Sequence, residues 1–205
     1  MKDKAATDDK IMDAFAVLVN EQGYSATTTS QLAKKAGVNE STIFRHFGDK
    51  MGLANELVKR YRSLIVELMD DFVPTWELED DLIEFSKRFR QQWPRQNVML
   101  VMFNTTKDPK QKQQLRGMIE KIRNYGVEMI IDYFQKMQQA EKIRDDIDYR
   151  QLALNFVWLN VGQFWSSRFW DGNQRISDTE FYELSVRPFA DLLTRRGVFD
   201  EHLQN

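Results

Sequence analysis

Hydrogen-bonding side chains crowd one short segment of this chain, from Glu40 to Phe47. In a helix, Ile43 and Phe47 fall on one face, and most of the remaining surface is polar. A helix of about eight residues with so few apolar anchors cannot be a core helix. Its polar face therefore needs a partner, and the major groove of DNA is wide enough to admit it. The polar residues concerned are Glu40, Ser41, Thr42, Arg45 and His46.

The residues around this segment predict a helix-turn-helix. Thr28 and Gln31 have the spacing of a capping box, in which each side chain satisfies a backbone N–H at a helix start. A first helix therefore begins at about Thr29, and Gly37 ends it by adopting the left-handed conformation. Asn39 can then cap the second helix, which starts at Glu40.

A longer pattern of residues at fixed spacing includes this motif. It consists of Gly23, Tyr24, Ala33, Ala36, Gly37, Val38, Thr42, Ile43, Phe44, His46, Phe47, Lys50 and Leu53. On these residues the chain resembles the TetR family of bacterial transcriptional regulators, and beyond them it matches that family in architecture only. The resemblance implies a helix-turn-helix DNA-binding domain over residues 1–50 and an effector-binding and dimerisation domain over residues 51–205.

The resemblance also implies two sets of contacts with double-stranded operator DNA. Base edges are reached in the family at the positions of Ser30, Glu40, Ser41, Thr42 and Arg45, and backbone phosphates at those of Thr29, Phe44, His46 and Lys50. Arg45 can pair with O6 and N7 of guanine, and Glu40 can accept from N4 of cytosine. Ser30 and Ser41 can equally support the helix N-termini, and Glu40 can complement the helix dipole.

One anchor differs from the family pattern. Phe44 stands where most members carry tyrosine, so a hydroxyl contact with phosphate is lost. An apolar contact between the Phe44 ring and a thymine methyl group becomes possible instead.

Apolar residues repeat with helical spacing along nearly the whole chain, and no segment alternates as a strand does. The expected fold is all-α, with a three-helix helix-turn-helix head followed by a helical ligand-binding and dimerisation body. Besides the segment from Glu40, helices are expected at about 9–21, 29–36, 49–72, 79–92, 98–105, 110–139, 149–170 and 180–195. We expect Pro94 and Pro109 to separate helices, and Pro188 to kink the last helix near Leu184.

Positive charge is concentrated near the proposed DNA-reading segment, although the formal net charge of the chain is −2. Between Gln31 and Arg62 the cations outnumber the carboxylates. They are Lys34, Lys35, Arg45, Lys50, Lys59, Arg60 and Arg62, against Glu40, Asp49 and Glu56. This distribution favours DNA binding by the head, while the acidic excess lies elsewhere.

Composition argues against several other classes of protein. The chain has no Cys and only two His, and it shows no phosphate-binding glycine loop or metal-ligand pair. We therefore expect no enzyme activity, no metal and no cofactor. The charged N-terminus is unlike a signal peptide, and the longest apolar run, Val98 to Phe103, is too short to span a membrane. A cytoplasmic protein with no membrane contact is the expectation.

The segment from Tyr149 to Trp170 is apolar on nearly every side, so a helix there must be covered all round. The resemblance implies a homodimer in which the last two long helices of each subunit form a four-helix bundle, and Gly162 permits close approach of backbones. A buried central helix of a monomer is the alternative interpretation.

The effector site is expected among aromatic side chains and polar groups of the body helices, because buried polar groups need partners. The candidates are Trp76, Phe103, Asn104, Asn155, Trp158 and Gln163. The function that follows is a dimeric DNA-binding transcriptional regulator, a repressor released from its operator by a small hydrophobic or aromatic effector. The alternative is a DNA-binding regulator controlled by a protein partner, or one without a small-molecule effector.

Overall fold

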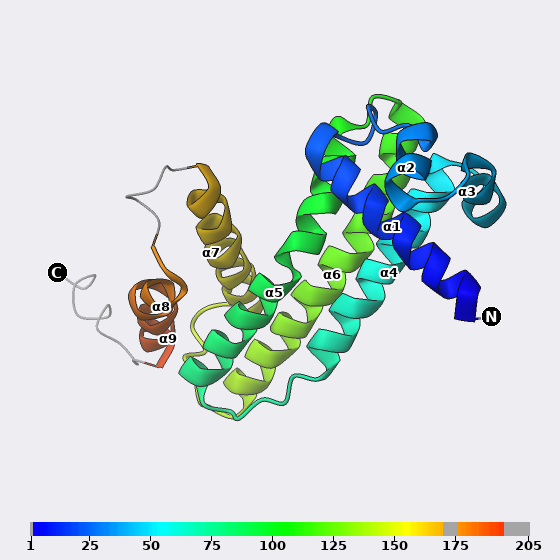
Figure 1. Cartoon of the computed structure of the whole chain (residues 1–205). Helices are drawn as coiled ribbons and strands as arrows, with labels where there is room; N and C mark the ends of the chain where they lie inside the picture. The colour runs from blue at the N-terminus through cyan, green and yellow to red at the C-terminus, as the bar shows by residue number, and fades with distance from the viewer. Residues whose placement is uncertain (1, 170–175, 195–205) are drawn as a thin grey trace. The chain divides into compact units, whose positions relative to one another are not determined.

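The chain is helical along most of residues 2–169 and 176–194, which a computed structural model describes (Figure 1). Side chains are described from Lys4 to Gln163 and from Ile176 to Thr194. The helices are α1 (Lys2–Gln22), α2 (Thr29–Ala36), α3 (Glu40–Phe47), α4 (Lys50–Asp70), α5 (Leu78–Thr105), α6 (Pro109–Gln139), α7 (Tyr149–Phe169), α8 (Asp178–Phe181) and α9 (Arg187–Thr194). The predicted all-α class is confirmed.

Local signals account for several helix starts. α6 begins at Pro109, where the missing amide hydrogen of proline is harmless, and Asp108 caps it by accepting from the Gln111 N–H at 2.7 Å. α8 begins after Ser177, which forms a capping box with Glu180. These helix starts need no distant contact.

Pro94 does not separate two helices, contrary to the expectation from sequence. α5 runs unbroken from Leu78 to Thr105 with Pro94 inside it. The proline is exposed, while its neighbours Trp93 and Val98 are each 3% exposed. Because the helix continues, the packing of these neighbours must outweigh the roughly 3 kcal/mol that proline costs in a helix interior.

The irregularity expected before Pro188 takes the form of a π-helical turn. This turn spans Tyr182–Val186 between α8 and α9, and the Arg187 N–H donates to the Tyr182 carbonyl. Such turns are a known cause of helix kinks. Trp170 and Arg195, the expected ends of the last two long helices, lie outside the described residues.

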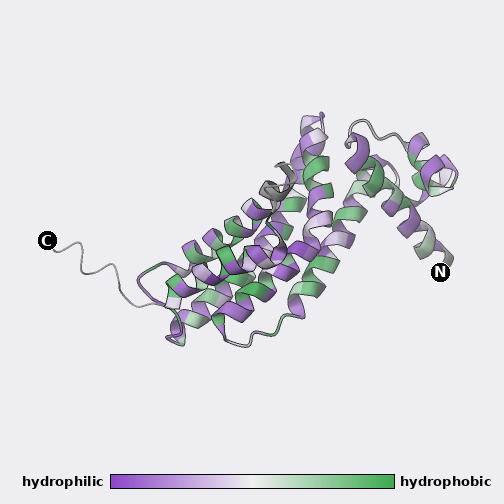
Figure 2. Ribbon diagram, turned by 60° about the vertical axis from the view of Figure 1, so that its left-hand side comes forward, coloured by the Kyte–Doolittle hydropathy of each residue, from purple (hydrophilic) through white to green (hydrophobic). Residues whose placement is uncertain are grey.

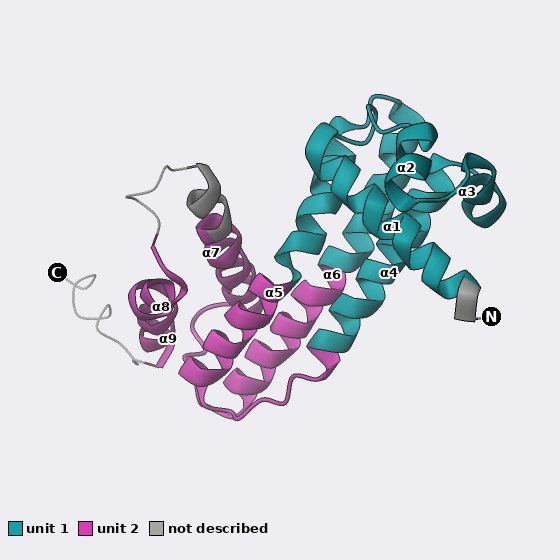
Figure 3. Cartoon of the chain, in the orientation of Figure 1, with its two compact units in different colours: residues 1–68, 92–123 teal, residues 69–91, 124–205 magenta. Residues whose placement is uncertain are grey.

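Two compact units make up the chain (Figure 3). Unit 1 comprises residues 1–68 and 92–123, and unit 2 comprises residues 69–91 and 124–205. Their boundaries fall within α4, α5 and α6. The predicted DNA-binding head, residues 1–50, lies wholly in unit 1. The boundary at residue 50 between this head and the effector-binding domain stays a prediction.

Unit 1 has a core that joins α1 to the start of α4. Ile11, Phe15 and Val19 of α1 and Leu53 of α4 are 0% exposed. The Phe15 ring meets the ring of Tyr24 edge to face, with centroids 6.2 Å apart. Figure 2 shows hydrophobic and hydrophilic residues interspersed along the coloured helices.

Unit 2 has an aromatic core with one buried carboxylate. Asp81 is 1% exposed and accepts hydrogen bonds from the backbone N–H of Thr75 and Trp76 and from the Tyr133 hydroxyl. The Tyr133 ring packs against Phe85 and stacks on Trp76. Burial, with the neighbouring Asp81, strongly raises the pKa of Tyr133. This cluster fixes the segment that leads into α5.

Candidate nucleic-acid interface

The first helix of the predicted motif is confirmed with its caps. The Thr28 hydroxyl accepts from the Gln31 N–H at 3.2 Å, and the Gln31 side chain accepts from the Thr28 N–H at 3.0 Å. At the other end Gly37 has φ of 68°, in the left-handed region that disfavours a side chain. The Val38 N–H then reaches the carbonyl of Ala33 at 3.0 Å, which closes the turn before α3.

α3 begins at Glu40 as predicted, but Asn39 does not cap it with its side chain. Asn39 has the extended backbone of a capping residue, yet its side chain makes no capping hydrogen bond. Only its backbone carbonyl takes part, by accepting from the Thr42 N–H at 2.9 Å. The expectation of an Asn39 side-chain cap is therefore wrong, and the α3 N-terminus keeps free N–H groups.

The outer face of α3 is open, as its polarity predicts. Ile43 is 0% exposed and anchors the helix, whereas Phe44 is 49% exposed. Ser41 and Arg45 are also exposed, as is Ser30 of α2, while Thr42 is half-buried. The Arg45 guanidinium lies 3.5 Å from a ring nitrogen of His46 and forms no ion pair with any described residue. A long cation on an open helix face is well suited to reach a guanine edge.

Two of the candidate residues bond to each other. The Thr29 hydroxyl at the start of α2 donates to the Glu40 carboxylate at the start of α3. Both side chains are half-buried. Glu40 thus links the two helices and keeps its second carboxylate oxygen for other donors.

His46 is held inside the head by an acidic partner. Its side chain is 8% exposed, and its Nδ1 atom lies 2.5 Å from a carboxylate oxygen of Asp8 in α1. This pair joins α3 to α1 across 38 residues of sequence. Asp8 was not among the residues expected from sequence, and no local spacing signals it.

Lys50 is likewise engaged within the head. Its ammonium group donates to the backbone carbonyls of Tyr24 at 3.0 Å and Thr27 at 2.9 Å. Burial lowers the pKa of this ammonium group below its usual value. Lys50 therefore ties the first turn of α4 to the turn between α1 and α2, and has one N–H left for another acceptor.

Part of the positive charge counted in the sequence is neutralised by ion pairs. Lys35 pairs with Glu21 at 3.1 Å, and Lys59 pairs with Glu56 at 2.6 Å. The partners of Arg60 are Asp9 and Asp13 of α1. Glu21, Asp9 and Asp13 lie outside the segment from Gln31 to Arg62, so the positive field of this region is weaker than the count over that segment suggests.

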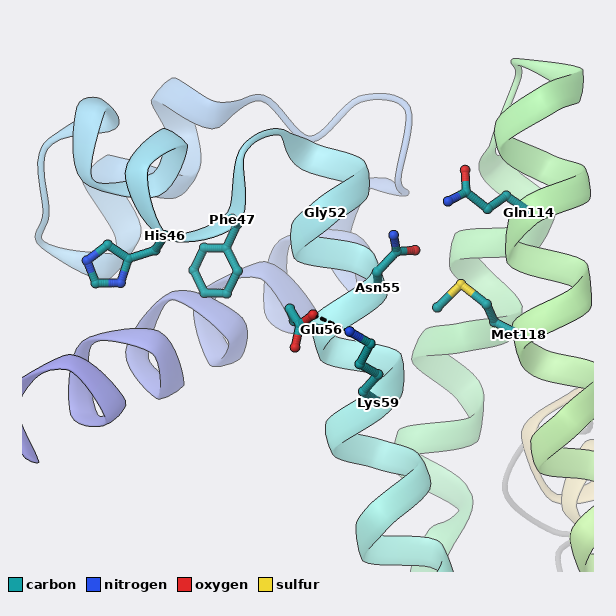
Figure 4. Close-up of a pocket in the computed structure, with 8 residues that line it drawn as sticks. All are labelled: His46, Phe47, Gly52, Asn55, Glu56, Lys59, Gln114 and Met118. Atoms are coloured by element: carbon teal, nitrogen blue, oxygen red, sulfur yellow. Dashed lines mark hydrogen bonds and ion pairs between the residues drawn. The ribbon is translucent and has the colours of Figure 1, made fainter. Parts of the chain in front are cut away.

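A hollow of about 430 Å³ opens in unit 1 beside the head (Figure 4). Asn55 of α4 faces Gln114 and Met118 of α6 across it. The Asn55 amide oxygen is buried and accepts no hydrogen bond from the described residues. A second, wider hollow, of about 930 Å³, lies along α3 and is lined in part by Lys4, Thr42 and Arg45.

The six effector candidates are not all in one place. Phe103 and Asn104 belong to unit 1, and the other four belong to unit 2. Trp158 is 68% exposed and Asn155 is also exposed, where it accepts from Gln151 at 2.8 Å. Gln163 donates to the carbonyl of Ile176 at 3.5 Å, and Trp76 stacks on Tyr133. None of the six lines either of the hollows described above.

The part of the chain that the structure describes contains neither a candidate metal site nor a candidate membrane-spanning helix. The described side chains form no group of three or more His, Cys, Asp or Glu residues that could hold a metal ion. Among the described helices, none is both long and apolar enough to cross a membrane.

Comparison with known proteins places this geometry in context. Residues 11–57 match the family described as bacterial regulatory proteins of the tetR family. An uncharacterised HTH-type transcriptional regulator of Bacillus subtilis, YvkB, is 27% identical over 67% of this chain and 71% of its own. The nucleoid occlusion factor SlmA of Haemophilus influenzae is 23% identical over 83% of this chain and 78% of its own.

A solved structure shares the fold. It is NalD of Pseudomonas aeruginosa, described as the secondary repressor of the MexAB-OprM multidrug efflux pump. The two chains superpose with a TM-score of 0.65 at 20% identity, over 96% of this chain and 100% of NalD. At this identity the likeness shows a common fold only, and nothing about the effector follows from it.

Proposed function

Because the chain belongs to the TetR family of DNA-binding transcriptional regulators and is not an enzyme, we propose that it is a dimeric repressor. In this proposal a small hydrophobic or aromatic effector releases it from operator DNA. A cytoplasmic location is part of the proposal, because a repressor must reach the chromosome. The observation that carries it is the open face of α3, where Arg45 and Phe44 point outward while Ile43 is fully buried.

The proposed contacts of the head with DNA are those that the resemblance to the family implies. Ser30, Glu40, Ser41, Thr42 and Arg45 contact base edges, and Thr29, Phe44, His46 and Lys50 lie nearest the phosphates. Arg45 is the main specificity residue, because its guanidinium is exposed and has no carboxylate partner among the described residues. The engaged side chains of His46 and Lys50 act chiefly by holding α3 and α4 in place for these contacts.

Dimerisation through the last two long helices is supported by exposed apolar residues in unit 2. On α7, Leu154 is 39% exposed and Trp158 is 68% exposed, and the two are one helical turn apart. Leu184 and Leu192, in the π-helical turn and α9, are 67% and 58% exposed. Large apolar side chains at this spacing favour a partner surface, and a second copy of the chain supplies one.

The effector proposal draws on the body helices. Trp76, Asn155 and Gln163 of unit 2 and Phe103 and Asn104 of unit 1 are proposed as effector contacts within their own units, and the exposed Trp158 is proposed for the dimer surface instead. An effector releases DNA only through its different affinities for the bound and released conformations. A change from mostly bound to mostly released needs roughly 5.5 kcal/mol of such preference, and operator DNA must weaken effector binding by the same factor.

Selection from random duplexes tests the DNA-binding part of the proposal. The full-length protein is expected to enrich a near-palindromic site whose half-sites lie roughly 34–36 Å apart, with two chains bound per duplex. Enrichment of no sequence, or of a single asymmetric half-site, would contradict it.

Calorimetry with an effector found by thermal-shift screening, with and without saturating operator, tests the switch.

A regulator controlled by a protein partner is the second candidate. SlmA, a nucleoid occlusion factor, matches a larger share of this chain than YvkB does. The dispersed effector candidates also suit a protein without a small-molecule site. If saturating operator leaves the affinity for every compound found by screening unchanged, this second candidate is favoured.

A further inference from the structure

Four cations cluster at the N-terminal end of α6, outside the helix-turn-helix. They are Lys107, Lys110, Lys112 and Arg116, and we call them the α6 basic end. All four are exposed except Lys112, which is half-buried. Unlike Lys35 of α2 and Lys59 of α4, none of the four forms an ion pair with a residue whose side chain is described. Asp108 is the only carboxylate between them.

The α6 basic end is attached to the DNA-binding head within unit 1. The Lys107 N–H donates to the Ser25 hydroxyl at 3.1 Å, and the Tyr24 N–H donates to the Thr105 hydroxyl at 2.8 Å. These bonds join the corner between α5 and α6 to the turn that leads into α2. Figures 1 and 3 show this corner at the same end of unit 1 as α2.

The cations are arranged on two sides of the helix end. The Lys112 ammonium lies 4.9 Å, and the Arg116 guanidinium 5.5 Å, from the centre of the Phe103 ring, which orients both charges. Lys110 is one turn before Gln114, which lines the hollow facing α4. Helical periodicity therefore places Lys110 on the α4 side.

We propose that the α6 basic end is a second DNA-contacting surface, which binds backbone phosphates flanking the site that α3 reads. The proposal rests on the proposed DNA-binding function and extends its footprint. Unpaired cations without a shaped pocket suit phosphates, which are bound through charge and carry no sequence information. DNA is the partner that fits best, because this surface adjoins the turn that leads into α2 of the proposed DNA-binding motif.

Salt dependence of binding tests this directly. In the variant carrying Lys107→Gln, Lys110→Gln, Lys112→Gln and Arg116→Gln, the slope of log affinity against log salt should fall by about 2–4 for each bound chain, since each lost phosphate contact removes about 0.9. Wild type should also gain affinity when the selected duplex is extended by about 10 base pairs on each side, and the variant should not. Lys87→Gln is the matched control, because Lys87 is an exposed, unpaired α5 cation among the described residues of unit 2.

Two outcomes overturn the proposal. One is an unchanged salt slope in the quadruple variant with a normal circular dichroism spectrum, and the other is equal affinity of wild type for short and extended duplexes. Failure of the proposed function looks different, because wild type then binds neither duplex above the level of a non-basic control protein. A quadruple variant that keeps its preference for the selected sequence while losing slope supports the proposal.

Discussion

The Lys50 ammonium group donates a hydrogen bond of 3.0 Å to the backbone carbonyl of Tyr24 and lies 4.5 Å from the centre of its ring. One cation thus joins the start of α4 to the turn that precedes α2. The ring contributes a cation–π contact, and Thr27 offers a second carbonyl at 2.9 Å. Lys50 is therefore expected to matter for the stability of the head as well as for DNA binding.

Lys50→Ala should lower the free energy of unfolding by roughly 1–3 kcal/mol, because two backbone carbonyls lose a charged donor. Urea denaturation measures this. Lys34→Ala is the control, since Lys34 is exposed and has no ion pair among the described residues. Equal stability of the two variants would show that the Lys50 contacts contribute nothing.

Arg45→Ala should weaken binding to the selected duplex by roughly 1–3 kcal/mol and relax the preference at one base pair. The reason is that the variant loses a bidentate contact with a guanine of the selected site. Random DNA does not present that guanine at a fixed position, so binding to it should change less. Fluorescence anisotropy on selected and random duplexes measures both affinities. If both fall by the same factor, Arg45 contacts phosphate and not a base.

The Tyr24 hydroxyl should make the stability fall at high pH. Burial, with the nearby carboxylates of Asp49 and Asp108, raises the pKa of Tyr24 from 10.0 to about 12. The folded state therefore keeps a proton that the unfolded chain has lost. The stability that results is fully present below pH 10 and is lost as the pH rises toward 12.

Comparison with Tyr24→Phe isolates this effect, which is roughly 2–3 kcal/mol at its largest. The difference in urea midpoint between wild type and the variant should be small at pH 9, because the buried hydroxyl has no hydrogen-bond partner among the described residues. At pH 11.5 the variant should be clearly more stable than wild type. A difference that is constant with pH would show that Tyr24 titrates normally.

Trp158→Asp should convert the proposed dimer to a monomer, because it places a charge on the exposed apolar face of α7. Sedimentation at micromolar concentration measures the change. Val73→Asp serves as control, since Val73 is 81% exposed in the segment between α4 and α5. A monomeric wild type would contradict dimerisation. A Trp158→Asp variant that stays dimeric would show that the interface lies elsewhere.

Alanine substitutions at two glycines should have opposite effects. Gly23 has φ of 85°, and an added Cβ would lie 2.9 Å from the Cβ of Thr105, so Gly23→Ala should destabilise the protein by about 1–2 kcal/mol or more. Gly117, in α6, has open space around it, and Gly117→Ala should stabilise by about 0.5–1 kcal/mol. Thermal unfolding of both variants checks the two signs.

Local sequence determined the elements that carry the candidate site. The capping box of Thr28 with Gln31 and the left-handed Gly37 set the bounds of α2, because each acts within a few residues. The spacing of Ile43 and Phe47 likewise identified α3 and its open face. These signals need no knowledge of the rest of the chain.

Only the tertiary structure decided which of the candidate side chains form hydrogen bonds or ion pairs within the chain. The bond between His46 and Asp8 spans 38 residues, and that between Lys50 and Tyr24 spans 26. The continuity of α5 through Pro94 likewise depends on packing around its buried neighbour Trp93. Such contacts form between segments that are distant in sequence, and their energies outweigh the local preferences on which prediction from sequence relies.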